Sequence, residues 1–241
     1  MSFHRCSLTL LASVAALLPQ QLFAQAAHSD AIFKYVDAQI ELLPSPGQEY
    51  SSQRVWTGEW DVGGFFAQDT NQPGWASEAV GGQGIGPGDI VAYNVLDNLY
   101  YWNEGVFASP DPQVHVRVQN NGSSDTLVDH ASGAQPGSVA APFVNTIGQA
   151  DGIGDFHKHV RYKLEHDSGA TPSFGAYGLS LSLSTNASGV ADSEPLFLIF
   201  NFGLSQQDFA AAANAYAELF TPSLPGDFNG DGSVDAADYT V

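Results

Sequence analysis

The sequence predicts a mainly β fold: an antiparallel, jelly-roll-like β-sandwich with one C-terminal helix and a terminal EF-hand-like calcium loop. Three observations support this fold class. Short segments of alternating apolar and polar residues, broken by Gly, Pro, Asn and Asp, recur from residue 31 to residue 201. The chain contains 25 Gly and 13 Pro while only 14% of its residues are charged, which is typical of turn-rich β proteins. After residue 201 the apolar residues change to helical spacing.

The expected strands follow one another along the chain. They fall in the segments 32–43, 55–66, 90–102, 114–118, 177–183 and 196–200. Within 114–118 the valines alternate with His115 and Arg117, so the valines face one side of the strand and the polar residues the other. The segment 196–200 is apolar throughout, which predicts a strand buried on both faces. Turn signals at 120–123 and 186–189 separate the segments.

One helix is expected over 205–220. Its apolar side is formed by residues at helical spacing: Phe209, Ala212, Ala213, Tyr216 and Phe220. Ser205 is a suitable N-cap, and Asp208 in the first turn is favoured by the positive end of the helix dipole. Pro222 and Pro225 end the helix and provide a linker.

The first residues are typical of a secretory signal peptide. Arg5 provides the positive start, 8–18 are apolar, and 24–26 form a small-x-small cleavage site. The apolar run is too short to span a bilayer, so we expect an exported protein (periplasm, cell surface or extracellular) without a transmembrane segment. The expected organisation is a signal peptide at 1–26, a β-sandwich domain at 27–221, a linker at 222–226 and a calcium loop at 227–241.

Composition argues against several classes of function. The chain has 7 Lys and Arg against 26 Asp and Glu, a formal net charge of −19, and nucleic-acid binding requires clustered basic residues. The single cysteine, Cys6, lies in the signal segment, so the domain has neither a disulfide nor a thiolate nucleophile. No Gly-x-Ser-x-Gly motif is present. The sequence favours a non-catalytic protein, although paired carboxylates for glycoside hydrolysis stay open because their separation does not follow from sequence.

The tryptophans leave two interpretations open. They are Trp56, Trp60, Trp75 and Trp102. Indole rings on a surface stack on sugars, which would indicate a carbohydrate-binding or polysaccharide-degrading accessory protein with a polysaccharide partner. Their apolar neighbours favour places in the core of the sandwich instead.

The carboxyl-terminal segment has the spacing of a calcium loop. Its expected ligands are Asp227, Asn229, Asp231, Ser233 (through its carbonyl), Asp235 and Asp238. Ca²⁺ prefers six to eight oxygen ligands, and Gly232 permits the sharp turn that brings them together. We therefore expect Ca²⁺ as a cofactor.

Residues 226–241 resemble the first half of a type I dockerin repeat. Asp238 belongs to this resemblance, since a general EF-hand has Glu at that position. Dockerins carry two loop–helix segments and dock onto cohesin domains, so the resemblance implies a cohesin-like or cell-surface partner. One loop precedes Val241, so we expect a truncated module.

A second cluster of polar residues lies in the segment 155–164. Read as one strand, it places these residues on a single face: Asp155, His157, His159, Arg161 and Lys163. Histidines two apart on a strand point the same way, so both imidazoles reach one ion. The alternative is that Asp155 and Arg161 form an ion pair beside solvated histidines.

The histidine segment also carries a resemblance. His157-x-His159-x-x-Tyr162, followed by 172–177, is similar to the signature of choice-of-anchor M surface domains. Landmarks at 28–32, 72–75, 102–107, 157–159 and 192–201 resemble an exported family of planctomycetes and cyanobacteria that ends in PEP-CTERM or dockerin-type signals. Some members of that family are under zinc-responsive repression, so the resemblance implies zinc handling.

The expected divalent-metal site draws on histidines and one carboxylate: His157, His159 and His28, with Asp30 or Asp155, and with His115 as an alternative third ligand. Neutral imidazoles with one carboxylate suit Zn²⁺ in tetrahedral geometry. The sequence therefore predicts an exported, metal-binding sandwich protein.

Overall fold

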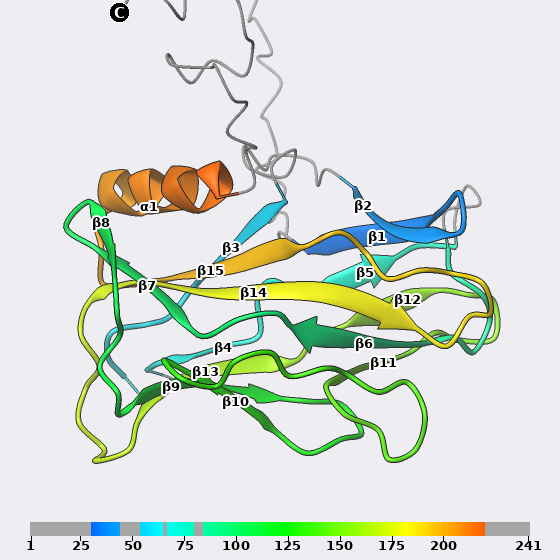
Figure 1. Ribbon diagram of the computed structural model, residues 1–241, viewed down its shortest axis with the longest axis horizontal. Helices are drawn as coiled ribbons and strands as arrows, with labels where there is room; N and C mark the ends of the chain where they lie inside the picture. Colours follow the sequence, from blue (N-terminus) through cyan, green and yellow to red (C-terminus); the bar gives the residue numbers. More distant parts are fainter. Residues whose placement is uncertain (1–29, 44–53, 65–66, 80–83, 220–241) are drawn as a thin grey trace, which may run out of the picture.

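The fold was obtained as a computed structural model, which describes residues 30–43, 54–64, 67–79 and 84–219. Within these residues it confirms a β-sandwich with one helix (Figure 1). The expected signal peptide at 1–26, the linker at 222–226 and the calcium loop at 227–241 lie outside the described residues.

The largest sheet has seven strands. They are β3 (Val55–Glu59), β6 (Ile90–Val95), β7 (Tyr100–Asn103), β8 (Val106–Ala108), β11 (Thr146–Gln149), β14 (Gly175–Thr185) and β15 (Leu196–Phe202). Their order is β11-β6-β14-β15-β3, and β7 pairs with β14 and with β8. Strand β14 is long enough to pair with β15 on one side and with both β6 and β7 on the other.

Two four-stranded sheets complete the sandwich. The first, the β1 sheet, contains β1 (Ala31–Val36), β2 (Gln39–Leu43), β5 (Trp75–Ser77) and β12 (Phe156–Lys158) in the order β12-β5-β1-β2. The second, the β9 sheet, contains β4 (Asp69–Thr70), β9 (Val114–Gln119), β10 (Thr126–Asp129) and β13 (Arg161–His166) in the order β10-β9-β13-β4. Most strand pairs are antiparallel, whereas β1–β5 and β15–β3 are parallel.

One apolar core joins the three sheets. The valines of β9, Val114, Val116 and Val118, are buried in it, while His115 and Arg117 point outward, as the alternation predicts. All three sheets contribute side chains to this cluster, so the two smaller sheets together cover one face of the largest sheet. Hydrophobic burial at this interface is what holds a chain without disulfides together.

Strand β15 is buried along its whole length, and its apolar run at 196–200 predicts burial on both faces. Leu196, Leu198 and Phe200 belong to the central core, whereas Phe197 and Ile199 belong to a second cluster with the helix. The helix α1 (Gln206–Glu218) lies over the outer face of the large sheet, on the side opposite β9, β10 and β13 (Figure 1). A strand covered on both faces needs apolar residues at every position.

The helix starts and packs as expected. Ser205 is its N-cap and accepts a hydrogen bond from the backbone N–H of Asp208, which lies in the first turn. Phe209 and Tyr216 are among its buried residues. Among the described residues no helix has the length and apolar character needed to cross a bilayer.

Two expected strands are divided in the structure. The segment 90–102 forms β6 and β7, with a turn between them. The segment 155–164 is not one strand: β12 ends at Lys158 in the β1 sheet, and β13 begins at Arg161 in the β9 sheet. The expected single polar face from Asp155 to Lys163 was therefore wrong, because the chain crosses from one sheet to the other at His159 and Val160.

Candidate metal centre

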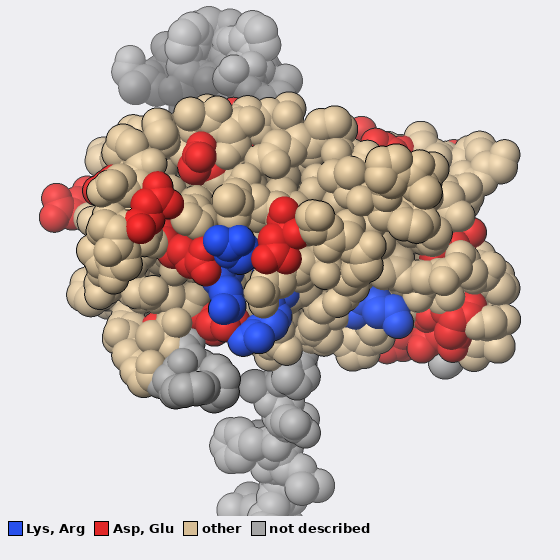
Figure 2. Space-filling model, turned by 90° about the horizontal axis from the view of Figure 1, so that it is seen from below, with Lys and Arg blue, Asp and Glu red and all other residues tan. Residues whose placement is uncertain are grey.

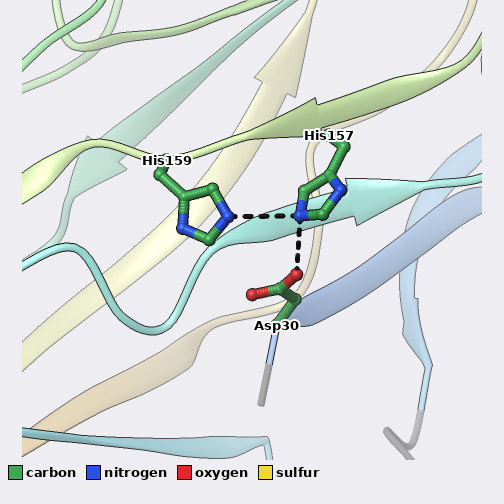
Figure 3. A group of neighbouring side chains, drawn as sticks. All are labelled: Asp30, His157 and His159. Carbon is green, nitrogen blue, oxygen red and sulfur yellow. Dashed lines mark hydrogen bonds and ion pairs between the residues drawn. The ribbon is translucent and has the colours of Figure 1, made fainter. Parts of the chain in front are cut away.

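Three chain segments meet at one end of the β1 sheet. They are the residue before β1, the loop leading into β5, and the segment in which β12 ends. The parallel pairing of β1 with β5 starts with a hydrogen bond from the N–H of Ala31 to the carbonyl of Gly74 (2.8 Å). On the other side of β5, His157 lies opposite Ala76. Asp30, His157 and His159 come together at this junction (Figure 3).

Asp30 is held with one oxygen fixed and the other directed at the histidines. The residue is 8% exposed. Its Oδ1 accepts a hydrogen bond from the backbone N–H of Gly74 (3.0 Å), and its Oδ2 lies 2.9 Å from Nε2 of His157. A buried carboxylate is costly unless it has such partners, so the local structure fixes this side chain toward the junction.

His159 is oriented by a backbone carbonyl. Its Nδ1 lies 2.8 Å from the carbonyl oxygen of Asn71, which can only accept a hydrogen bond. Nδ1 therefore carries the proton, and in the neutral ring Nε2 has a free lone pair. This Nε2 lies 3.1 Å from Nε2 of His157. A ring nitrogen held by a backbone carbonyl, with the other nitrogen facing a site, is the arrangement found in metal-binding histidines.

His157 lies between two acceptors. Its Nε2 is within hydrogen-bond distance of both Oδ2 of Asp30 and the lone pair on Nε2 of His159. One N–H cannot point at both, and a deprotonated Nε2 would leave three electron-rich atoms facing one another. A cation at their centre would be attracted to all three atoms. The side chain of His157 is 59% exposed, so the junction is open to solvent.

Gly74 leaves the space in which the aspartate and the histidine meet. A Cβ on this residue would lie 2.6 Å from Oδ1 of Asp30 and 2.4 Å from the ring of His159. Any side chain here would displace one of the two groups. Gly74 lies in a landmark segment of the sequence, but this role does not follow from sequence because the crowding depends on residues far away in the chain.

The junction rests on the aromatic core. Trp75, next to Gly74, donates a hydrogen bond from Nε1 to the hydroxyl oxygen of Tyr162 (3.1 Å). Burial raises the pKa of Tyr162, so its hydroxyl stays protonated. From the other side, Nδ2 of Asn121 donates to the carbonyl of His159 (2.9 Å). These contacts fix the backbone that presents the histidine, and neither was predicted.

Other sequence-predicted ligands lie elsewhere. The carboxylate of Asp155 accepts a hydrogen bond from the N–H of Ala79 (3.2 Å) and is not part of the cluster. Arg161 pairs with Asp69, so the expected alternative of an Asp155–Arg161 ion pair is wrong. His28 lies outside the described residues. The expected calcium ligands lie there too: Asp227, Asn229, Asp231, Ser233, Asp235 and Asp238.

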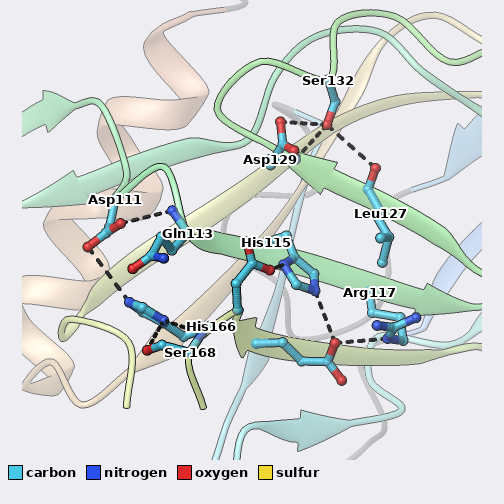
Figure 4. A network of polar contacts seen from close by, with 11 residues as sticks. Asp111, Gln113, His115, Arg117, Leu127, Asp129, Ser132, His166 and Ser168 are labelled. Carbon is cyan, nitrogen blue, oxygen red and sulfur yellow. Dashed lines mark hydrogen bonds and ion pairs between the residues drawn. The ribbon is translucent and has the colours of Figure 1, made fainter. Parts of the chain in front are cut away.

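His115 belongs to a separate polar network on the outer face of the β9 sheet (Figure 4). Its Nε2 lies 3.0 Å from Oε2 of Glu165, and its Nδ1 lies 3.3 Å from Oδ1 of Asp167. Arg117 donates to the same Oε2 of Glu165 (2.8 Å). Figure 2 shows Lys and Arg side chains gathered on this side of the molecule with Asp and Glu beside them. His115 is thus not brought to the Asp30 junction.

The tryptophans lie in the interior. Trp56 and Trp75 are 0% exposed, Trp60 is 3% exposed and Trp102 is 4% exposed. Trp60 stacks on Phe200 with ring centroids 4.6 Å apart. The interpretation as core residues is therefore correct, and none of these indole rings offers a face to a sugar.

Comparison with known proteins gave no match: no protein-family model, no curated protein and no solved structure matches this chain.

Proposed function

We propose that this protein is an exported, non-catalytic, surface-associated β-sandwich that binds a divalent transition metal, first of all Zn²⁺, through Asp30, His157 and His159. The observation that carries this proposal is the convergence of one ligand atom from each residue within 4.8 Å of one another. Two imidazoles and a carboxylate are a donor set that suits Zn²⁺ and other first-row metals.

The spacing supports an ion of this size. Bonds of about 2.0–2.1 Å in a tetrahedral zinc site put neighbouring ligand atoms about 3.3 Å apart. The observed separations are 2.9 Å between Asp30 and His157 and 3.1 Å between His157 and His159. A tetrahedral site would need each of these two pairs to open by a few tenths of an ångström.

Binding is best tested by calorimetric titration of the full chain with Zn²⁺. Excess Ca²⁺ in the buffer keeps acidic sites elsewhere occupied by the harder cation. We expect one strong site in the wild type and its loss in the double variant His157→Ala/His159→Ala. The matched control is His115→Ala/His166→Ala, which also removes two histidines, both from the β9 sheet. Equal isotherms for the two double variants would refute the site.

Co²⁺ offers a second readout. Its visible absorption reports coordination number, and loss of the bound Co²⁺ bands on addition of Zn²⁺, which has no visible absorption, would identify a shared site. His28 remains a proposed further ligand, and the variant His28→Ala tests it in the same titration. If only the control variant altered the Co²⁺ spectrum, the metal would be bound at the β9 sheet instead.

We also retain the calcium loop at 227–241 as a proposal, with a cohesin-like or cell-surface partner for it. The support is the spacing of its oxygen-bearing residues in the sequence. Circular dichroism of a synthetic 222–241 peptide with Ca²⁺ and with a chelator tests this proposal without involving the histidines. Identical spectra, together with no Ca²⁺ uptake, would exclude it.

A further inference from the structure

The turn after β9 contains an asparagine that is followed directly by a glycine. Asn121 and Gly122 are both exposed, and they border a hollow of about 190 Å³, so water reaches them. The backbone at Gly122 has a φ of +89°, and a Cβ on this residue would meet no atom within 4 Å. Among the hydrogen bonds of the described residues, none uses the N–H of Gly122. The backbone nitrogen of Gly122 is therefore available for reaction.

An exposed Asn-Gly pair loses ammonia by an intramolecular reaction. The backbone nitrogen of Gly122 attacks Cγ of Asn121, and the bond from Cγ to Nδ2 breaks. The N–H proton of Gly122 passes through solvent to the departing nitrogen, which leaves as ammonia and gives a cyclic imide. Water then opens the ring at either carbonyl, so that aspartate or isoaspartate stands at position 121. Water is the only co-reactant, and glycine favours the ring closure because it has no Cβ to crowd it.

The side chain of Asn121 ties this turn to the metal-binding junction. Its Nδ2 donates to the carbonyl of His159 and to the carbonyl of Ile147, each at 2.9 Å. Both bonds need the two N–H groups of an amide, and an ionised carboxylate has none. After the loss of ammonia, a negatively charged group would face two carbonyl oxygens. Both hydrogen bonds would then be lost.

His159 is the metal ligand that this change reaches. Its Nδ1 still has the carbonyl of Asn71 as a partner, but the backbone that carries the ring would lose the bond from Asn121. Groups that hold a metal ligand from outside the ligand set affect metal affinity by about 10–100-fold. We infer that Asn121 is a deamidation site, and that its conversion to a carboxylate weakens the metal centre. The effect on the metal rests on the proposed zinc site, whereas the modification itself does not.

Peptide mapping of the full chain, after long incubation without metal at mildly alkaline pH, tests the modification. Trypsin cleaves after Arg117 and Lys158, and therefore separates Asn121 from the other Asn-Gly pair of the chain, Asn229-Gly230. We expect the mass of the peptide 118–158 to increase by the difference between an amide and a carboxyl group, with the change located at Asn121.

The same incubation in denaturant gives the reference rate. Ammonia leaves only after the bonds to Ile147 and His159 have opened, so the folded chain should react more slowly than the denatured one. No conversion at Asn121 in the folded chain, over many half-lives of the denatured reaction, would overturn the inference.

Gly122→Ala is the matched control for the reaction. This variant keeps the amide of Asn121, and its Cβ finds open space, but the methyl group hinders ring closure. Alanine is strained at a φ of +89°, so thermal unfolding is measured alongside. We expect slower conversion at Asn121 and a zinc affinity equal to that of the wild type. Equal conversion rates in the two proteins would contradict attack by the nitrogen of Gly122.

Calorimetry with Zn²⁺ tests the effect on the metal. Asn121→Asp should bind Zn²⁺ at least about tenfold more weakly than the wild type. The control is Asn98→Asp, in the turn between β6 and β7, which adds the same charge and keeps an acceptor for the N–H of Gly133. It should leave zinc affinity unchanged. Incubated wild type is titrated as well, after its deamidated form has been separated by ion exchange, so the result does not depend on the folding of one variant.

Two outcomes would break the link between the modification and the metal. Wild-type zinc affinity in both deamidated forms would overturn it, as would an equal loss of affinity in Asn98→Asp. Absence of Zn²⁺ binding by the unmodified wild type would instead refute the proposed metal centre, and peptide mapping would still decide whether Asn121 is modified.

Discussion

Two groups of histidines lie on the surface of this sandwich, and they differ in where their ring nitrogens point. At the junction of β1, β5 and β12, the Nε2 atoms of His157 and His159 face each other and one carboxylate oxygen. On the β9 sheet, the two nitrogens of His115 point apart, each toward a different carboxylate. The first group concentrates lone pairs at one place, whereas the second distributes its interactions over separate partners.

This difference shows why composition alone does not identify a metal site. Both groups combine histidine with acidic residues, but at the β9 sheet Arg117 donates to Glu165 and offsets its charge. At the junction, Oδ2 of Asp30 lies 2.9 Å from Nε2 of His157. A cation gains most where several electron-rich atoms converge on one point.

The largest expected effect comes from Asp30→Asn. The amide keeps the shape and can still accept from the N–H of Gly74, but the negative charge among the ligands is lost. We expect zinc affinity to fall at least about 100-fold, since even changes outside the ligand set cost 10–100-fold. Competition with a chromophoric chelator measures this. Asp155→Asn is the control, and an equal fall in that variant would show that the ion lies elsewhere.

A smaller effect is expected from Gly74→Ala. The added methyl group displaces the ring of His159 or Oδ1 of Asp30 while all ligands remain present. Zinc affinity should fall about 10–100-fold, and the Co²⁺ spectrum should change shape. Gly63→Ala serves as control because a Cβ there meets no atom within 4 Å. Unchanged zinc affinity in Gly74→Ala would mean that metal binding does not depend on the close approach of Asp30 and His159 to the backbone at Gly74.

The smallest effect concerns the β9 sheet. Burial by itself raises the pKa of Glu165, but hydrogen bonds from Arg117 and His115 outweigh it, and the net shift is downward from 4.5. Because the pKa of Glu165 is lower in the folded state than its ordinary value, the ionised carboxylate stabilises the fold at pH values above that ordinary value. This stabilisation is lost as the pH falls below about 4.5 and the carboxylate is protonated. The pair is partly solvated, so we expect at most about 1 kcal/mol.

Denaturant unfolding at several pH values checks this pH dependence. The wild type should lose more stability than Glu165→Gln between neutral pH and the acid range, while zinc affinity at neutral pH should be the same in both proteins. If Glu165→Gln weakened zinc binding, the two histidine groups would be coupled and the comparison between them would fail.

Local patterns predicted much of the fold. The valine alternation gave the inner face of β9, and the unbroken apolar run gave a strand covered on both sides. What local patterns did not predict was the change of sheet after Lys158, because both halves of that segment alternate in the same way. Which sheet a strand joins depends on its packing against distant segments. The spacing of apolar residues along the strand does not determine this.

The candidate site was predicted in part. His157, His159 and Asp30 were all proposed ligands, and the structure brings them together. The role of Gly74 and the hydrogen bond from Asn121 did not follow from sequence, since each depends on contacts between remote segments.

The strand order β12-β5-β1 brings Asp30, at the beginning of the described chain, next to His157 in its second half. An ion shared by Asp30 and His157 would therefore act as a reversible cross-link closing a very long loop. Such a closure restricts the denatured ensemble, by about 4–5 kcal/mol for covalent loops on the order of 100 residues. In a domain without cysteines, metal availability would then regulate how long the folded molecule survives proteolysis.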